Sequence, residues 1–267
     1  MSPNFDAALA LTTADSIESD HVTWHGHMTR DWSIGPVPNG GYTAALQLHA
    51  LTRHTSYPIA SSLTTHYYRP TIGDTACTIE TQIQRAGRST THADATLVQD
   101  GKVRARSVAV LGDYPADELV LPTPAPVITP PNECEARDPK SQGLNMTLMD
   151  SLEIRLDPSA TNIDENGAAC IDAWVRFRDG RANDALAMAL FVDSFPPAVL
   201  MAVTNAGWVP TIEMTTHIRA EAQPGWIQGR VTTANVRGGT LIEDVQLWDG
   251  EGVLVGEARQ LALLRTQ

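Results

Sequence analysis

The chain has 267 residues, 42% of them hydrophobic and 19% charged, which is enough to bury one large core or two smaller ones. The net charge of −12 makes nucleic acid a poor partner, because an acidic surface repels a phosphate backbone. No apolar run approaches the roughly 20 residues that cross a bilayer, so we expect no membrane span.

The N-terminal segment and the cysteines favour a reducing cytoplasm. The sequence begins MSPNFD, with no basic start and an early Asp6, which does not fit a secretory signal. Cys77, Cys134 and Cys170 are widely spaced, and no Cys-x-x-Cys is present. This pattern predicts buried or half-buried free thiols rather than disulfides or a zinc site. We expect a cytoplasmic protein without a metal or a cofactor.

The first part of the chain, residues 1–111, predicts a strand, a helix and a meander. The strand surrounds Trp24 in HVTWHGH, and Ala and Leu favour a helix over 41–52. Strands are expected at about 61–69, 75–86, 90–98 and 103–111, with a hairpin turn at Asp100-Gly101. Residues 112–150 follow as a linker, since the prolines between 120 and 131 disfavour helix and central strand.

The last part, residues 151–267, repeats this order. A strand surrounds Trp174, and a helix is predicted over 194–203, where prolines would be tolerated in the first turn. Strands are expected at about 211–219, 225–236, 240–248 and 253–264, with a turn at Asp249-Gly250.

A constant offset supports a duplication. His66 and His217 are 151 residues apart, and the same offset relates four further pairs: Gly87 and Gly238, Gly101 and Gly252, Val103 and Leu254, Ala105 and Gly256. The pattern predicts an α+β fold of two fused units, each a long helix wrapped by a curved antiparallel sheet. We expect the two sheets to join into one surface, and unpaired edges to favour a homo-oligomer.

This repeated order resembles the double-hotdog fold, and four motifs resemble the type II acyl-CoA thioesterase family. The motifs are Pro38-Asn-Gly-Gly-Tyr42, Tyr67-Tyr-Arg-Pro70, Phe191-Val-Asp-Ser-Phe195 and Val253-Leu-Val-Gly-Glu-Ala-Arg-Gln260. The resemblance covers about 20–111 and 170–265, and it implies acyl-CoA as the substrate. In that family an Asp, a Thr and a Gln of the second unit hold and activate a water. The matching positions here are Asp193, Thr211 and Gln260.

These three side chains are polar in the second unit only. At the repeat offset their counterparts are small residues: Ala109 for Gln260, Ala60 for Thr211, and Gly40 or Gly41 for Asp193. Thr215, in contrast, is matched by Thr64, so Thr211 is preferred for the threonine role. The repeat therefore predicts one active site per chain.

Each candidate also has an ordinary structural interpretation. Asp193 could cap the second helix, which stabilises by about 1 kcal/mol. Gln260 could face solvent and Thr211 could be a plain strand residue. Gly40 and Gly41 could form a turn or a helix entry that needs unusual dihedrals, and they could also bind the substrate by offering free helix N–H groups to its carbonyl oxygen.

Two other functions stay open. A hotdog enoyl-CoA hydratase or dehydratase needs an Asp and a His, and Asp20 and His25 have the bare spacing but lie at a strand. A non-catalytic acyl-binding or interaction module is the second alternative. His21, His25 and His27 are expected to be an exposed strand face rather than metal ligands.

Overall fold

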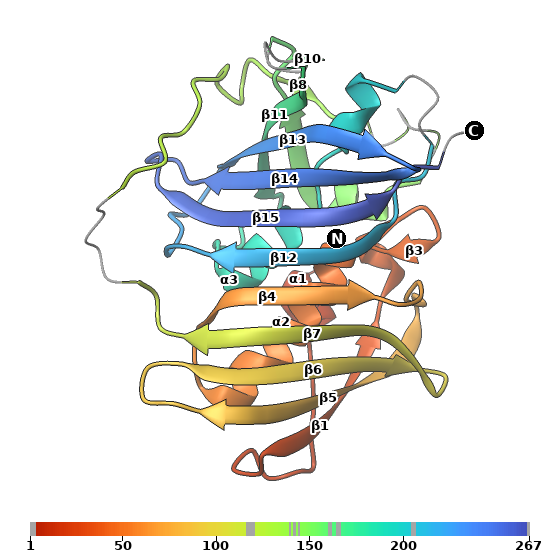
Figure 1. The fold of residues 1–267 in the computed structure, drawn as a ribbon, viewed down its shortest axis with the longest axis vertical. Helices are drawn as coiled ribbons and strands as arrows, with labels where there is room; N and C mark the ends of the chain where they lie inside the picture. Colours follow the sequence, from red (N-terminus) through yellow and green to blue (C-terminus); the bar gives the residue numbers. More distant parts are fainter. Residues whose placement is uncertain are drawn as a thin grey trace.

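One antiparallel sheet runs through both halves of the chain (Figure 1). The computed structural model describes residues 4–115, 121–138, 140, 143, 145–159, 162–163, 167–203 and 207–265, so part of the predicted linker 112–150 lies outside the described residues. Across the sheet the strands are β1 (His21–Met28), β5 (Thr75–Ala86), β6 (Thr91–Gln99), β7 (Lys102–Gly112), β4 (Ile59–Tyr67), β12 (Thr211–Ile218), β15 (Leu254–Leu263), β14 (Thr240–Trp248), β13 (Ile227–Arg237), β11 (Ala169–Phe177), β9 (Leu152–Leu156) and β8 (Glu135–Ala136).

Shorter elements complete the fold. Strand β10 (Asn162–Ile163) pairs with β11, and β2 (Ser33–Ile34) pairs with β3 (Val37–Pro38) in a small separate ribbon. The helices are α1 (Phe5–Ala8), α2 (Gly40–Thr55) and α3 (Ala185–Phe191). Single 3₁₀ turns cover Arg30–Trp32, Thr147–Asp150 and Ala198–Met201.

The two units meet where β4 pairs with β12. In this seam Thr64 lies opposite Thr215 and Leu63 opposite Thr216, in antiparallel register. The expected continuous sheet is therefore confirmed. The strand predictions also hold within a few residues, and the hairpin at Asp100 and Gly101 has positive φ angles of 51° and 67°, as its turn type requires.

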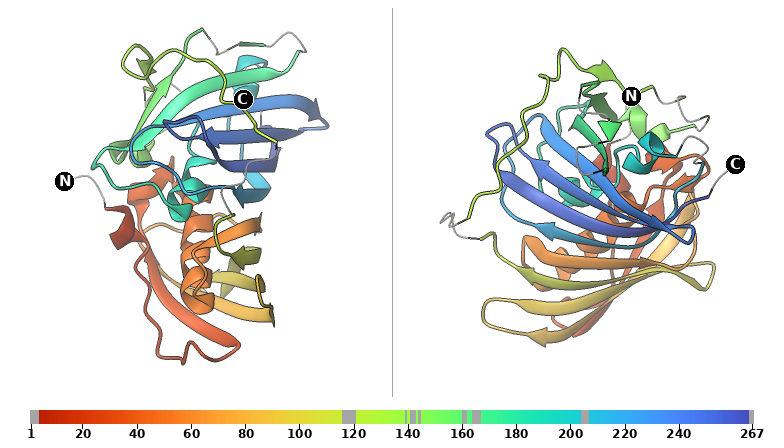
Figure 2. Two further views of the ribbon diagram at one scale, coloured as in Figure 1. Left: turned by 90° about the vertical axis from the view of Figure 1, so that its left-hand side faces the viewer. Right: turned by 45° about the horizontal axis from the view of Figure 1, so that its top comes forward.

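Helix α2 is a long buried helix that begins with a side-chain cap. The Asn39 Oδ1 accepts the Tyr42 N–H at 3.0 Å. The helix ends at Thr55, and the capping residue Ser56 adopts a left-handed conformation with φ 59°. Helices α2 and α3 lie together against the same face of the sheet (Figure 2). This packing places the first turn of α2 beside the end of α3.

The second helix is not where the sequence predicted it. Helix α3 covers Ala185–Phe191 and is capped by Asp184, whose Oδ1 accepts the Ala187 N–H at 2.8 Å. The predicted helix over 194–203 is wrong. Pro196 and Pro197 lack N–H groups and disfavour the helical conformation of the preceding residue, so the following apolar run forms only a 3₁₀ turn. The second unit thus has a short helix followed by an irregular segment.

The described part of the proline-rich linker lies against the C-terminal half of the sheet. Its carbonyl oxygens accept hydrogen bonds from three side chains: Trp248 to Thr123 at 2.9 Å, Gln228 to Pro126 at 2.7 Å, and Trp174 to Thr129 at 2.9 Å. Residues 121–134 form neither a helix nor a strand, and β8 follows them. The domain boundaries at 111 and 151 remain predictions.

Other expectations concern exposure and thiols. All three cysteines are free and buried, as predicted. His21, His25 and His27 are exposed on one face of β1, as predicted. No helix in the described ranges is long and apolar enough to cross a membrane.

Candidate active site

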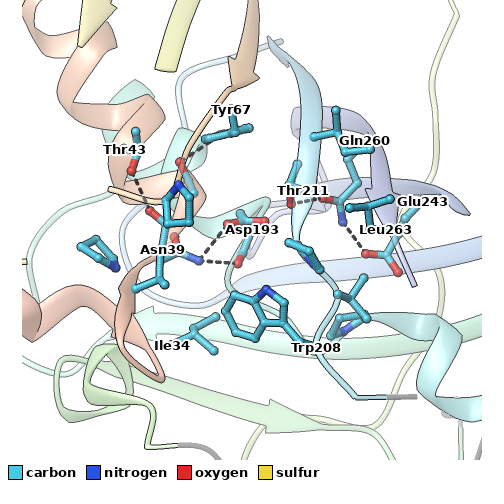
Figure 3. Close-up of a pocket in the computed structure, with 18 of the residues that line it drawn as sticks. Ile34, Asn39, Thr43, Tyr67, Asp193, Trp208, Thr211, Glu243, Gln260 and Leu263 are labelled. Atoms are coloured by element: carbon cyan, nitrogen blue, oxygen red, sulfur yellow. Dashed lines mark hydrogen bonds between the residues drawn. The ribbon is translucent and has the colours of Figure 1, made fainter. Parts of the chain in front are cut away.

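A cavity of about 380 Å³ opens between the two units, next to the first turn of α2. It contains all three residues expected to be catalytic. Asp193 comes from the segment after α3, Thr211 from the start of β12, and Gln260 from β15 (Figure 3). The apolar part of its wall includes Ile34, Val192, Phe195, Trp208, Val245 and Leu263.

The Asp193 carboxylate lies at the N-terminus of α2, the helix of the other unit. Its Oδ2 accepts the Gly41 N–H at 2.9 Å and an Asn39 Nδ2 hydrogen at 2.8 Å. The same Asn39 amide also donates to the Asp193 main-chain oxygen at 2.8 Å. Asp193 follows α3 instead of beginning it, so its interpretation as the cap of the second helix is wrong. Asn39, which the sequence shows only as part of the Pro38–Tyr42 motif, both caps α2 and holds Asp193.

Burial controls the acidity of Asp193. Removal from water raises the pKa of its carboxyl group to about 6, although hydrogen bonds from the Gly41 and Gly40 amides and from the Asn39 side chain favour the charged form. The group is therefore ionised at neutral pH, with a pKa close to working pH. Such a carboxylate is suited to accept a proton from water.

Thr211 and Gln260 belong to a chain of hydrogen bonds. The Thr211 hydroxyl donates to Gln260 Oε1 at 2.7 Å, and Gln260 Nε2 donates to Glu243 Oε1 at 2.6 Å (Figure 3). Gln260 is only 7% exposed, so the solvent-facing interpretation of this residue is wrong. Glu243 was not among the residues selected from the sequence, because an acidic residue in an alternating strand is typical of an exposed face.

At Gly40 and Gly41 a glycine is required because a Cβ atom would clash with neighbouring atoms, and not because the backbone needs unusual dihedrals. Both lie at the entry of α2, as the helix-entry interpretation predicted, but neither is among the described residues with positive φ, so the prediction of unusual dihedrals is wrong. A Cβ on Gly41 would lie 2.7 Å from the Leu190 carbonyl oxygen, and one on Gly40 would lie 2.9 Å from Asp193 Oδ2. The Gly41 amide is already engaged by Asp193, whereas Gly40 lines the cavity. Their role in binding substrate remains a prediction.

The cavity has a further polar wall. Tyr67, from the end of β4, lines it and donates its hydroxyl to the Gly40 carbonyl oxygen at 2.9 Å. Burial raises the pKa of Tyr67 well above its ordinary value, so the phenol stays protonated. The residue was visible in the sequence within the Tyr67–Pro70 motif, but its contact with α2 depends on the fold.

Other candidate groups lie elsewhere. Thr215 is in the seam and does not line the cavity among the described residues. No described histidine lines the cavity either, and His25 is exposed on β1. Within the described ranges, no group of at least three His, Cys, Asp or Glu side chains is arranged to hold a metal ion.

The two halves also match known families separately. Residues 131–264 match the acyl-CoA thioesterase C-terminal domain, and residues 28–112 match the acyl-CoA thioesterase N-terminal domain. The chain belongs to the acyl-CoA thioesterase family. Members of this family are thioester hydrolases built as double hotdogs, so the predicted family and fold are confirmed.

Several relatives and solved structures match this acyl-CoA thioesterase family member along nearly its whole length. A protein of Mycobacterium tuberculosis H37Rv, described as uncharacterized, is 27% identical over an alignment of 304 positions that covers 100% of both chains. A Thermobifida fusca structure, provisionally described as a thioesterase II, has a TM-score of 0.85 and 27% identity, covering 98% of this chain and 97% of that one. A hotdog structure of unknown function from Alicyclobacillus acidocaldarius has a TM-score of 0.86 at 23% identity and covers 98% of each chain, which supports the fold alone.

Proposed function

We propose that this protein hydrolyses acyl-CoA thioesters to the free acid and CoA by direct attack of an activated water. The observation that carries the proposal is the convergence of Asp193, Thr211 and Gln260 in one cavity with a large apolar wall. Their counterparts in the first unit cannot do this chemistry, because Ala60 and Ala109 have no polar side-chain atoms. We therefore assign one active site to each chain.

The carboxylate of Asp193 is the general base. It takes a proton from water while the water oxygen forms a bond to the thioester carbonyl carbon and the carbonyl π electrons move to oxygen. The partial positive charge at the N-terminus of α2, next to Gly40, favours the oxyanion. When the intermediate collapses, the C–S bond breaks and the CoA sulfur takes the proton back from Asp193. No covalent enzyme intermediate is needed.

Thr211 and Gln260 orient the water. Both side chains combine donors and acceptors, so they can fix the direction in which the water presents its lone pair. The acyl chain would lie along the apolar wall, which includes Phe195, Trp208 and Leu263. In this arrangement the base acts on one side of the water and the Thr211–Gln260 pair on the other.

The test is release of free thiol from a panel of acyl-CoA substrates. We expect Asp193→Asn to lower kcat by about 100-fold or more, the usual contribution of a general base. Asp184→Asn is a matched control, because asparagine also caps helices and Asp184 lies at the opposite end of α3. Equal rates for the parent and Asp193→Asn would overturn the assignment of Asp193. No release from any chain length would favour an acyl-binding module.

The hydratase alternative has less support. Reversible addition of water to an enoyl thioester needs proton transfer to and from carbon by an Asp and a His, and no histidine lines the described cavity. Crotonyl-CoA separates the two reactions. Loss of enoyl absorbance without thiol release would identify a hydratase, whereas thiol release with the enoyl group intact would support hydrolysis.

A further inference from the structure

Glu243 is a buried acid within an otherwise apolar row of β14. The neighbouring inward positions of the strand are Leu241, Val245 and Leu247, and Glu243 is itself only 3% exposed. A carboxylate in such a row is costly unless its oxygen atoms are fully hydrogen-bonded. Its presence beside the cavity therefore calls for an explanation other than core packing.

Both oxygens of this carboxylate accept hydrogen bonds. Oε1 accepts from Gln260 Nε2 at 2.6 Å, and Oε2 accepts from the Ala198 N–H at 2.8 Å and from the Thr233 hydroxyl at 2.9 Å. None of the ion pairs between described residues includes Glu243. The carboxylate is thus held by neutral donors, and one of them belongs to a proposed catalytic side chain.

The sheet register shows that the fold does not require this acid. Glu243 lies directly opposite Gln260 in the β14–β15 pair, and the corresponding pair of the first unit is Ala93 opposite Ala109. Both alanines are buried. The same position in the same fold is therefore stable with two methyl groups.

The contact fixes which way the Gln260 amide faces. A glutamine amide can rotate to exchange its oxygen and nitrogen, but the Glu243 carboxylate, in the ionised form that it takes above its pKa of about 7, can only accept hydrogen bonds. With Glu243 on one side, the NH₂ group must face it and the carbonyl oxygen must face Thr211. The Thr211 hydroxyl then donates to Gln260, which leaves the hydroxyl lone pairs available to a proton of the attacking water.

We propose that Glu243 is a positioning residue of the hydrolytic site, which sets the orientation of the Gln260 amide and, through it, of the Thr211 hydroxyl. This inference rests on the proposed hydrolytic function. Glu243 also lines the cavity, but both of its carboxylate oxygens are engaged by protein donors, so we expect its effect to pass through Gln260. Removal of Glu243 should therefore disturb catalysis only while Gln260 is present.

A double-mutant cycle tests this dependence. We expect Glu243→Gln to lower kcat about 10-fold with little change in KM. A glutamine at position 243 can hydrogen-bond the Gln260 amide in either orientation, so the orientation of Gln260 is no longer fixed. In a Gln260→Ala background the same substitution should have no further effect on kcat. Asp244→Asn is the matched control, since Asp244 is the next residue on β14 and pairs with Arg259 instead. Equal losses in both backgrounds, or an unchanged kcat in Glu243→Gln, would overturn the proposal.

A second measurement does not depend on turnover. The side-chain amide signals of Gln260, identified by their absence in Gln260→Ala, can be followed by ¹⁵N-resolved NMR. We expect slow solvent exchange in the parent and faster exchange in Glu243→Gln, with unchanged exchange in Asp244→Asn. Unchanged signals in Glu243→Gln would contradict the role of Glu243. If the parent releases no thiol but these signals respond as expected, the proposed function fails while the contact stands.

Discussion

The hydroxyl groups of Thr64 and Thr215 lie 2.9 Å apart across the seam between β4 and β12. The two residues are 151 positions apart, which is the repeat offset itself, so each threonine meets its own counterpart. A residue can face its own copy only on a two-fold axis. The internal symmetry axis of the duplicated fold therefore passes between these two side chains.

The pH dependence of hydrolysis follows from the pKa of Asp193, which burial raises to about 6. A general base must be ionised, so kcat/KM should rise steeply with pH up to about 6, and ionisation of Glu243 should extend a smaller rise to about 7. Below that value we expect a fall of about tenfold per pH unit. Thiol release measured between pH 4.5 and 8.5 checks this. The steep rise centred near pH 6 should be missing from the residual activity of Asp193→Asn, and a rise at that pH that survives the substitution would assign the titration to another group.

Thr211 and Thr215 should respond differently to the same change. Thr211→Val removes the donor to Gln260, and we expect kcat to fall about 10-fold or more, within the range found for lost transition-state contacts. Thr215→Val removes the seam hydrogen bond, which should cost about 1 kcal/mol of stability and leave kcat near the parent value. Kinetics and thermal unfolding of both variants provide the comparison. A catalytic loss in Thr215→Val alone would reverse the assignment.

Alanine at Gly40 and at Gly41 should separate activity from stability. A Cβ at Gly41 would press on the Leu190 and Ala189 carbonyl oxygens, at 2.7 and 2.8 Å, where only backbone can give way. We expect Gly41→Ala to destabilise the fold by about 1–3 kcal/mol. A Cβ at Gly40 meets Asp193 Oδ2 at 2.9 Å, so Gly40→Ala should displace the base and lower kcat with a smaller effect on stability. Urea unfolding and thiol release distinguish the two outcomes.

The stability of the protein should also depend on Glu243. Burial raises its pKa to about 7, above the ordinary value of 4.5, so between these values the folded chain binds a proton that the unfolded chain does not. The free energy of unfolding therefore falls as pH rises through this window. Glu243→Gln has no such titration, and its stability relative to the parent should improve from pH 5 to pH 8, by at most about 3 kcal/mol. If the difference in free energy of unfolding between the parent and Glu243→Gln, measured with urea, stays constant across this pH range, the raised pKa of Glu243 is contradicted.

The fold could be predicted largely because the duplication is visible as a constant offset. Alternation along the strands and the Asp100-Gly101 turn defined the meander within a few residues. The second helix could not be placed, because Pro196 and Pro197 are compatible with either the first turn of a helix or its termination. The correct position of the helix is that of α3, which begins after Asp184. An Asp at this position is as typical of a loop as of a helix cap, so the sequence does not distinguish the two.

The site was predictable only in part, for a different reason. Asp193, Thr211 and Gln260 were selected through family resemblance together with their absence from the first unit. Asn39 and Glu243 act through contacts between distant strands or helices, and no local pattern reports such contacts. Glu243 in particular depends on sheet register, which decides whether a strand residue faces the core or solvent.

The seam between β4 and β12 also has a consequence for the order of folding. Each meander can form from neighbouring hairpins, whereas the seam requires segments about 150 residues apart to find each other, a slow step on topological grounds. The contact of Asp193 with Asn39 and Gly41 spans the same divide. During refolding we therefore expect most secondary structure to return before any hydrolytic activity does.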